Sequence, residues 1–169
     1  MKDINRKIQL QICNIGKLCK EHRLTLVTAE SCTGGGLAYF ITNEPECSVI
    51  LERGYVVYSN QAKKSLLEVS SDALQTAGAV SEEVTRQMAE GGLKNSIAQV
   101  AIATSGIAGE DLKSSAHEAK GIVWIACAGI DKETVSKKHV IKGKRKTFNL
   151  KSILFSLEFL QHFILSNFN

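Results

Sequence analysis

The sequence lacks the features that would place the protein in a membrane or give it a disulfide framework or a zinc site. Its 169 residues hold no apolar run near the ~20 residues that a membrane-spanning helix needs. The first ten residues carry scattered charges and no continuous apolar core, so they do not form a signal peptide. The five cysteines are odd in number and form no CxxC pair. We therefore expect reduced thiols and a cytoplasmic protein with no membrane contact.

The sequence also lacks a large excess of charge of one sign and the common phosphate-loop motifs. The net charge is only +4, and the basic stretch KGKRK at 142–146 stands alone without interleaved aromatic residues. Neither GxxxxGK[ST] nor GxGxxG occurs. We expect no nucleic-acid partner, although the mild positive charge would suit an anionic small molecule. The hydrophobic share of 44% and the charged share of 22% indicate a globular chain, and we expect a single domain over residues 1–169.

What the sequence does contain is an alternation of helical and strand patterns. Apolar residues recur every three or four positions in 4–19 and 147–164, which predicts two helices that each bury one face. Further helices are predicted at 37–42, 60–68 and 81–95, and strands at 24–29, 54–59, 99–105 and 121–129. The alternation in TVSKKHVI (134–141) is typical of an antiparallel edge strand. Interleaved strands and helices predict a layered α/β fold with a mixed sheet.

Two polar, glycine-containing segments follow predicted strands. They are TAESCTGGG (28–36) and TSGIAGED (104–111). Ligands in such folds bind outside the carboxyl ends of the strands, so the two segments would share one crevice if their strands were neighbours. Gly34 and Gly35 would let the backbone approach a ligand, and the following helix start would favour a phosphate. The alternative is a tight turn in which Ser31 or Thr33 caps the helix.

The candidates for chemistry lie in and near these segments: Glu30, Ser31, Cys32, Thr33, Ser48, Tyr55, Tyr58 and Lys63. No histidine is among them, so a Ser–His–Asp arrangement would need a distant histidine to fold back. Lys63 follows a predicted strand and can return to the crevice as a neutral base for a serine. A free lysine has a pKa of about 10.4, so this role needs burial or a nearby cation. The alternative is a solvated lysine on a helix surface.

Five motifs occur in the order and spacing of the CinA C-terminal domain family: TAESCTGG, LERGYVVYSNQAK, GAVSEEV, SGIAG and GIVWIACA. The chain resembles this family from about residue 5 to residue 165. The resemblance implies a three-layer α/β/α sandwich, here with a mixed, mostly parallel sheet. It also implies hydrolysis of the carboxamide of nicotinamide mononucleotide, as in the family's stand-alone amidases, without metal or cofactor. A homodimer is expected.

The same resemblance assigns the site residues. Ser31, Ser48, Tyr58 and Lys63 form the expected catalytic group, with Ser31 favoured as the nucleophile because it ends a strand beside helix N–H groups. The expected substrate contacts are Glu30, Thr33, Gly34, Gly35, Ser105, Gly106, Gly109 and Arg145.

Two departures from the family pattern leave a second hypothesis open. The segment 110–120 lacks the family's proline and paired glycines, and Lys144 stands where an aspartate is usual. A non-catalytic paralogue that binds a pyridine nucleotide or a similar phosphate ligand is the alternative.

Overall fold

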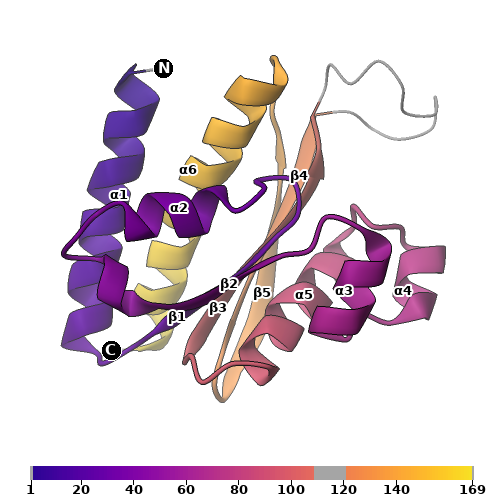
Figure 1. Cartoon of the computed structure of the whole chain (residues 1–169), viewed down its shortest axis with the longest axis horizontal. Coiled ribbons are helices and arrows are strands. Elements are labelled where there is room, and N and C mark those ends of the chain that lie inside the picture. Colours follow the sequence, from indigo (N-terminus) through magenta and orange to yellow (C-terminus); the bar gives the residue numbers. More distant parts are fainter. Residues whose placement is uncertain (1, 109–120, 169) are drawn as a thin grey trace.

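Five strands form one mixed sheet with helices on both faces (Figure 1). The computed structural model describes residues 2–108 and 121–168. The elements are α1 (Lys2–Glu21), β1 (Leu26–Glu30), α2 (Gly36–Thr42), a short 3-10 helix (Ser48–Ile50), β2 (Leu51–Val56), α3 (Asn60–Leu67), α4 (Ser71–Thr76), α5 (Glu82–Lys94), β3 (Val100–Ile107), β4 (Ile122–Gly129), β5 (Lys132–Val140) and α6 (Arg145–Asn167). None of these described helices is long and apolar enough to cross a membrane.

The strand order is β2-β1-β3-β4-β5. β1 pairs in parallel with both β2 and β3, whereas β4 runs antiparallel to β3 and to β5. The expected mixed α/β sandwich is therefore confirmed, with four of the five strands pointing the same way because only β4 is reversed. The edge strand predicted at 134–141 is β5, which is antiparallel to its neighbour as expected.

The two faces of the sheet carry side chains of different size. Large residues such as Leu26, Ile102 and Ile125 point into the core cluster that α1, α2 and α6 cover. The alternate positions of the strands are mostly alanines, and they face α5. Small side chains let α5 lie close, as a Cβ built on its Gly92 would come 3.6 Å from the Cβ of Ala29. Because successive strand residues point to opposite faces, one sheet supports both helical layers.

The second helical layer holds α3 firmly in place. At Gly91 of α5, an added Cβ would lie 1.9 Å from the carbonyl oxygen of Leu67 at the end of α3, so only glycine permits this contact. α3 also buries Lys63 and Leu67, four residues apart on the same helix face. The packing of α3 against α5 therefore turns Lys63 toward the sheet.

The sequence patterns misplaced one strand and missed two short helices. The strand predicted at 54–59 is β2 at Leu51–Val56, three residues earlier. β2 is an edge strand, so the charged residues Glu52 and Arg53 fit within it, whereas the prediction relied on the apolar run that starts after them. The short helix α4 and the 3-10 helix were not predicted because neither is long enough to show a helical period.

Candidate active site

The carboxyl ends of β1 and β3 lie side by side. Glu30, the last residue of β1, pairs in register with Thr104 of β3, and the N–H of Ser31 donates to the Thr104 carbonyl at 3.0 Å. The two polar segments therefore do share one edge of the sheet, as their sequence positions predicted.

Ser31 and Lys63 meet at this edge. Lys63 is only 1% exposed, and its Nζ lies 3.1 Å from Ser31 Oγ. α3 begins directly after the strand end, where the side chain of its N-cap Ser59 accepts a hydrogen bond from the N–H of Ala62. One turn further on, Lys63 occupies a core-facing position that an apolar residue would usually fill. The helix thus places the Lys63 amine beside Ser31, directly after the end of β1.

The surroundings of Lys63 favour the neutral amine. Desolvation by burial lowers its pKa from the ordinary lysine value. Its Nζ lies 3.0 Å from the carbonyl oxygen of Val57 and 3.4 Å from that of Tyr58, and no described carboxylate forms an ion pair with it. A neutral amine has two N–H donors and one lone pair. It can keep both carbonyl contacts and accept the hydrogen of Ser31 Oγ, which is the arrangement of a general base.

The loop that carries Ser31 is fixed by the Glu30 carboxylate. This side chain is fully buried and accepts three hydrogen bonds, from Thr33 Oγ1 at 2.7 Å and from the N–H groups of Leu37 and Ala38 at 2.9 Å each. The carboxylate therefore occupies the first N–H donors of α2, where it also meets the positive end of the helix. Both carboxylate oxygens of Glu30 therefore bond within the protein and stabilise the loop.

The hydrogen bonds of Glu30 bear on the prediction that a phosphate binds at the start of α2. Gly34 and Gly35 adopt positive φ angles of 61° and 88°, which glycine tolerates readily, and they form the tight turn before α2. The glycines thus form a tight turn, but neither Ser31 nor Thr33 caps the helix: the N-cap is Gly35, and the Glu30 carboxylate accepts from the N–H groups of Leu37 and Ala38.

Two other predicted substrate contacts also bond within the protein. Thr33 Oγ1 lies 2.9 Å from Thr104 Oγ1 across the two strand ends. The hydroxyl of Ser105 donates to the Ala79 carbonyl at 2.7 Å and anchors the segment before α5. Thr104 was not singled out in the sequence, although its place at the end of the strand before SGIAG was a usable signal.

A small cleft of about 90 Å³ is lined by Cys32, the residue that follows Ser31 in the chain. It brings together three of the predicted residues, Tyr58, Gly106 and Arg145; its other lining residues are Cys32, Ile107, Ala108, Phe148 and Asn149. A Cβ on Gly106 would come 2.6 Å from the Ile122 carbonyl oxygen, which explains the glycine. Tyr58 is 68% exposed, so its ring is accessible at the mouth of the cleft. Gly109 and the segment 110–120, which differs from the family pattern, lie outside the described residues.

Cys32 is a poor competitor for the role of nucleophile. Burial raises the pKa of its thiol to about 12, so the thiol stays protonated at neutral pH. Ser31, with an amine at hydrogen-bond distance, is the better candidate.

Ser48 lies far from this group. It precedes β2 at the end where Leu51 pairs with Leu26, whereas the Ser31 end is where Val56 pairs with Glu30. Five residues of strand, roughly 17 Å at about 3.3 Å each, separate the two ends. The hydroxyl of Ser48 donates to the Pro45 carbonyl at 3.0 Å. The structure thus does not bring Ser48 to Lys63, contrary to the catalytic group expected from the sequence.

Lys63 is buried beside the hydroxyl of Ser31 at the carboxyl edge of a mixed α/β sheet. The two residues form a serine–lysine pair, an arrangement that is used in nucleophilic catalysis. Residues 10–164 match the model of the CinA C-terminal domain, and the chain belongs to that family.

Relatives and a solved structure agree with this membership. The chain is 42% identical over 144 residues to a nicotinamide-nucleotide amidohydrolase PncC from Enterobacter agglomerans, which covers 85% of this chain and 87% of that protein. The protein of the same name from Escherichia coli K12 is 38% identical over 153 residues, 90% of this chain and 92% of the relative. A competence damage-inducible protein A structure from Klebsiella pneumoniae superposes with a TM-score of 0.89 at 28% identity, covering 96% of this chain and 99% of that one.

Proposed function

We propose that the protein is an amidohydrolase that converts nicotinamide mononucleotide to nicotinate mononucleotide and ammonia. The observation that carries the proposal is the 3.1 Å contact between Lys63 Nζ and Ser31 Oγ in a buried site with no carboxylate partner for the amine among the described residues. The choice of substrate rests on the two relatives named nicotinamide-nucleotide amidohydrolase.

In the proposed reaction, Ser31 Oγ attacks the carboxamide carbon while neutral Lys63 takes its proton. The tetrahedral intermediate then collapses, and the protonated lysine returns the proton to the nitrogen that leaves as ammonia. Water hydrolyses the resulting serine ester with Lys63 again as base, releasing the carboxylate and restoring the serine.

The intermediate needs donors for its oxyanion. The N–H groups of Cys32 and Thr33 follow the nucleophile directly in the chain, and neither donates to an acceptor on another residue of the described part. We assign the oxyanion to these two donors.

Substrate binding is assigned to the cleft residues. Arg145 lines the cleft at the start of α6, between the exposed Lys144 and Lys146, and this basic segment suits the substrate phosphate. The accessible ring of Tyr58 stands at the mouth, where a pyridinium ring can stack on it.

The test is ammonia release from nicotinamide mononucleotide by the purified full chain, with Ser31→Ala as the inactive variant and Ser48→Ala as the matched control. Turnover by the wild type and by Ser48→Ala, but not by Ser31→Ala, is the expected result. A thermal shift with the nucleotide and no ammonia would instead identify the non-catalytic paralogue and end the proposal.

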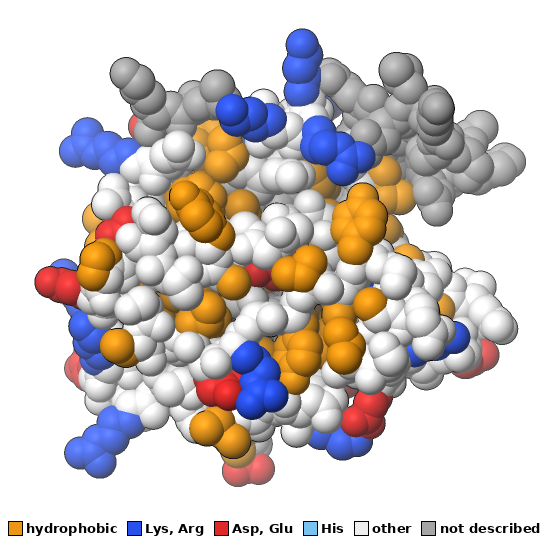
Figure 2. All heavy atoms as spheres, viewed as in Figure 1, with side chains coloured by type: hydrophobic (Ala, Val, Ile, Leu, Met, Phe, Trp, Pro, Cys, Tyr) orange, Lys and Arg blue, Asp and Glu red, His pale blue; other side chains and the backbone are white. Residues whose placement is uncertain are grey.

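The homodimer remains a prediction, and the β2 edge is the surface on which we expect the second copy. Large hydrophobic side chains are exposed around this edge strand, namely Tyr39, Val49, Val56 and Tyr58. Figure 2 shows hydrophobic side chains gathered over the middle of this face. Light scattering should give a dimer for the wild type and a larger monomer fraction for Val49→Lys. The expected cytoplasmic location and the absence of a nucleic-acid partner also stay predictions.

A further inference from the structure

A chain of buried hydrogen bonds runs beneath the loop that follows Ser31. Thr33 Oγ1 donates to the Glu30 carboxylate at 2.7 Å and lies 2.9 Å from Thr104 Oγ1. The Thr104 hydroxyl also forms a hydrogen bond with the side chain of Cys32. Glu30 and Thr104 are fully buried. The chain therefore crosses from the end of β1 to the end of β3 and returns to the residue directly after Ser31.

The carboxylate sets the direction of each hydrogen bond in this chain. A carboxylate only accepts, so the single hydrogen of the Thr33 hydroxyl points to Glu30. Thr33 must then accept in its second contact, which makes Thr104 the donor. The thiol of Cys32 stays protonated at neutral pH, because burial raises its pKa to about 12, and it can donate to the Thr104 oxygen. Each hydroxyl thus has one fixed orientation.

Thr104 holds three consecutive residues of the loop at once. Its carbonyl accepts from the N–H of Ser31 at 3.0 Å. Its hydroxyl bonds to the side chains of the next two residues, Cys32 and Thr33. The backbone N–H groups of these same two residues are the donors assigned above to the oxyanion. Donors of this kind are effective only when they are fixed in advance, because any reorientation would raise the barrier of the reaction.

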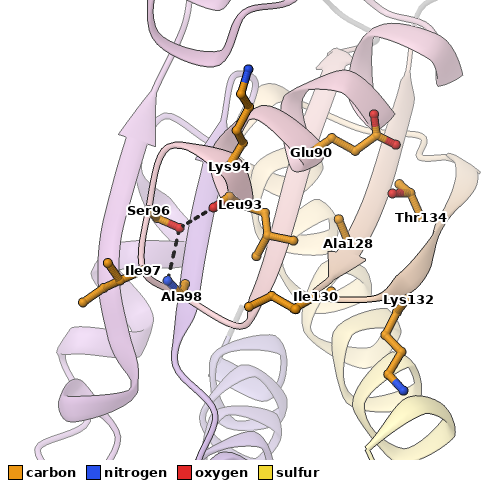
Figure 3. A pocket seen from close by; sticks show the side chains of 11 residues that line it. Glu90, Leu93, Lys94, Ser96, Ile97, Ala98, Ala128, Ile130, Lys132 and Thr134 are labelled. Carbon is orange, nitrogen blue, oxygen red and sulfur yellow. Dashed lines mark hydrogen bonds between the residues drawn. The ribbon is translucent and has the colours of Figure 1, made fainter.

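The opposite end of β3 shows a hydroxyl with a purely local role. Beside a cavity of about 460 Å³, Ser96 donates to the Leu93 carbonyl at 3.1 Å and accepts from the N–H of Ala98 at 3.3 Å (Figure 3). These bonds join residues two or three positions apart, whereas the contact between Thr33 and Thr104 spans 71 positions. Ser96 therefore stabilises one turn, while Thr104 fixes one strand end relative to another.

We propose that Thr104 is a positioning residue, whose hydroxyl holds Cys32 and Thr33 so that their N–H groups face the oxyanion of the tetrahedral intermediate. This role rests on the amidohydrolase function proposed above. It adds to that function a fully buried residue that acts through its two neighbours in the loop.

The experiment removes the hydroxyl and keeps the shape of the side chain. Thr104→Val should lower kcat for ammonia release from nicotinamide mononucleotide by on the order of tenfold, with KM within about twofold, because ground-state binding does not use the oxyanion donors. Thr104→Ser restores the hydroxyl and should return kcat to within about threefold of the wild type. Thr33→Val breaks the same chain from the loop side, so it should give a similar loss even if Thr104→Val does not fold.

The double variant Thr33→Val/Thr104→Val shows whether the two hydroxyls act as one unit. Its kcat should be no lower than about that of the worse single variant, since the second substitution removes a contact that is already broken.

Two controls remove hydroxyls elsewhere. Thr85 of α5 is also fully buried, and its hydroxyl donates to the Ser81 carbonyl at 2.7 Å. Thr85→Val and Ser96→Ala should each lower the melting temperature and leave kcat within about twofold of the wild type.

A lower melting temperature with unchanged kcat in Thr104→Val would show a merely structural threonine and overturn the positioning role. Additive losses in the double variant, or no recovery in Thr104→Ser, would overturn it as well. In each of these cases the wild type still releases ammonia, so the amidohydrolase function stands. No ammonia from the wild type would end both proposals.

Discussion

Ser31 and Ser48 stand at opposite ends of the same pair of parallel strands, and among the described residues only Ser31 has an amine at hydrogen-bond distance. Ser31 follows β1, is nearly buried and lies 3.1 Å from an amine. Ser48 precedes β2, is half-buried and donates to a backbone carbonyl. Ser31 lies within TAESCTGG and Ser48 lies just before LERG; the sequence favoured Ser31 because it ends a predicted strand, but it did not show which serine lies beside Lys63. The ranking comes from α3, because this helix starts at the carboxyl end of β2 and places Lys63 at that end.

The largest effect is expected from replacing Ser31 by alanine, with Ser48→Ala as the comparison. Ser31→Ala should lower kcat by on the order of a thousandfold or more, because it removes the atom that attacks the substrate. Ser48→Ala should stay within about twofold of the wild type, since a half-exposed serine at a turn makes only a local contact. Steady-state ammonia release measures both. The reverse pattern would exchange the roles of the two serines and refute our assignment.

The next largest effect concerns Lys63 as the base. Lys63→Arg and Lys63→Met should each lower kcat by on the order of a thousandfold, because a guanidinium stays protonated and a thioether cannot take a proton. For the wild type, kcat/KM should rise about tenfold per pH unit until the lowered pKa of Lys63 is passed, because only the neutral amine acts. If Lys63→Arg keeps most of the activity and Lys63→Met changes mainly KM, the lysine is a substrate contact instead.

A third prediction tests the lowered pKa of Lys63 through the pH dependence of the free energy of unfolding. Burial lowers the pKa of Lys63 in the folded chain, so between that pKa and the unfolded value of about 10.4 the unfolded chain holds a proton that the folded chain has lost. The free energy of unfolding should therefore rise with pH in this window, by at most about 1.4 kcal/mol per pH unit from this group. Denaturant unfolding of wild type and Lys63→Met across pH isolates the contribution. Parallel curves for the two proteins would mean that the lysine is not perturbed by folding.

A smaller effect is expected at Glu30, whose carboxylate holds the loop after Ser31 through hydrogen bonds within the protein. Glu30→Gln replaces one acceptor oxygen by an NH2 group and leaves one buried partner unpaired, at a cost of about 1–3 kcal/mol. We expect a lower melting temperature and a kcat reduced about tenfold, with KM nearly unchanged, because Ser31 would be less well positioned. A KM effect that exceeds the kcat effect would assign Glu30 to substrate binding, as the sequence first suggested.

The smallest effect is expected from metal removal. Within the described part of the chain, no three His, Cys, Asp or Glu side chains gather closely enough to hold a metal ion. In the proposed mechanism the serine–lysine pair supplies both nucleophile and base, so activity should be unchanged after treatment with EDTA. Loss of activity that a divalent ion restores would contradict the mechanism.

Sequence patterns were sufficient for most of the fold and for part of the site. The long helices α1 and α6 and the buried strands were predictable because burial of one face imposes a period on the sequence. Ser31 and Lys63 were predictable as candidates because polar residues at strand ends mark the ligand edge of such sheets. β2 was misplaced because an edge strand tolerates charged residues and so weakens the apolar signal.

By itself the sequence determined the alternation of strands and helices, the family and the residues available for chemistry. Only the tertiary structure decided three contacts: buried Lys63 lies against Ser31, the Glu30 carboxylate accepts from the first turn of α2, and Ser48 bonds to the Pro45 carbonyl away from both. The physical reason is that a local pattern sets which face of a helix or strand is buried. What that face then meets depends on strand order and on the contact of α3 with α5, which join residues more than 20 positions apart in the chain.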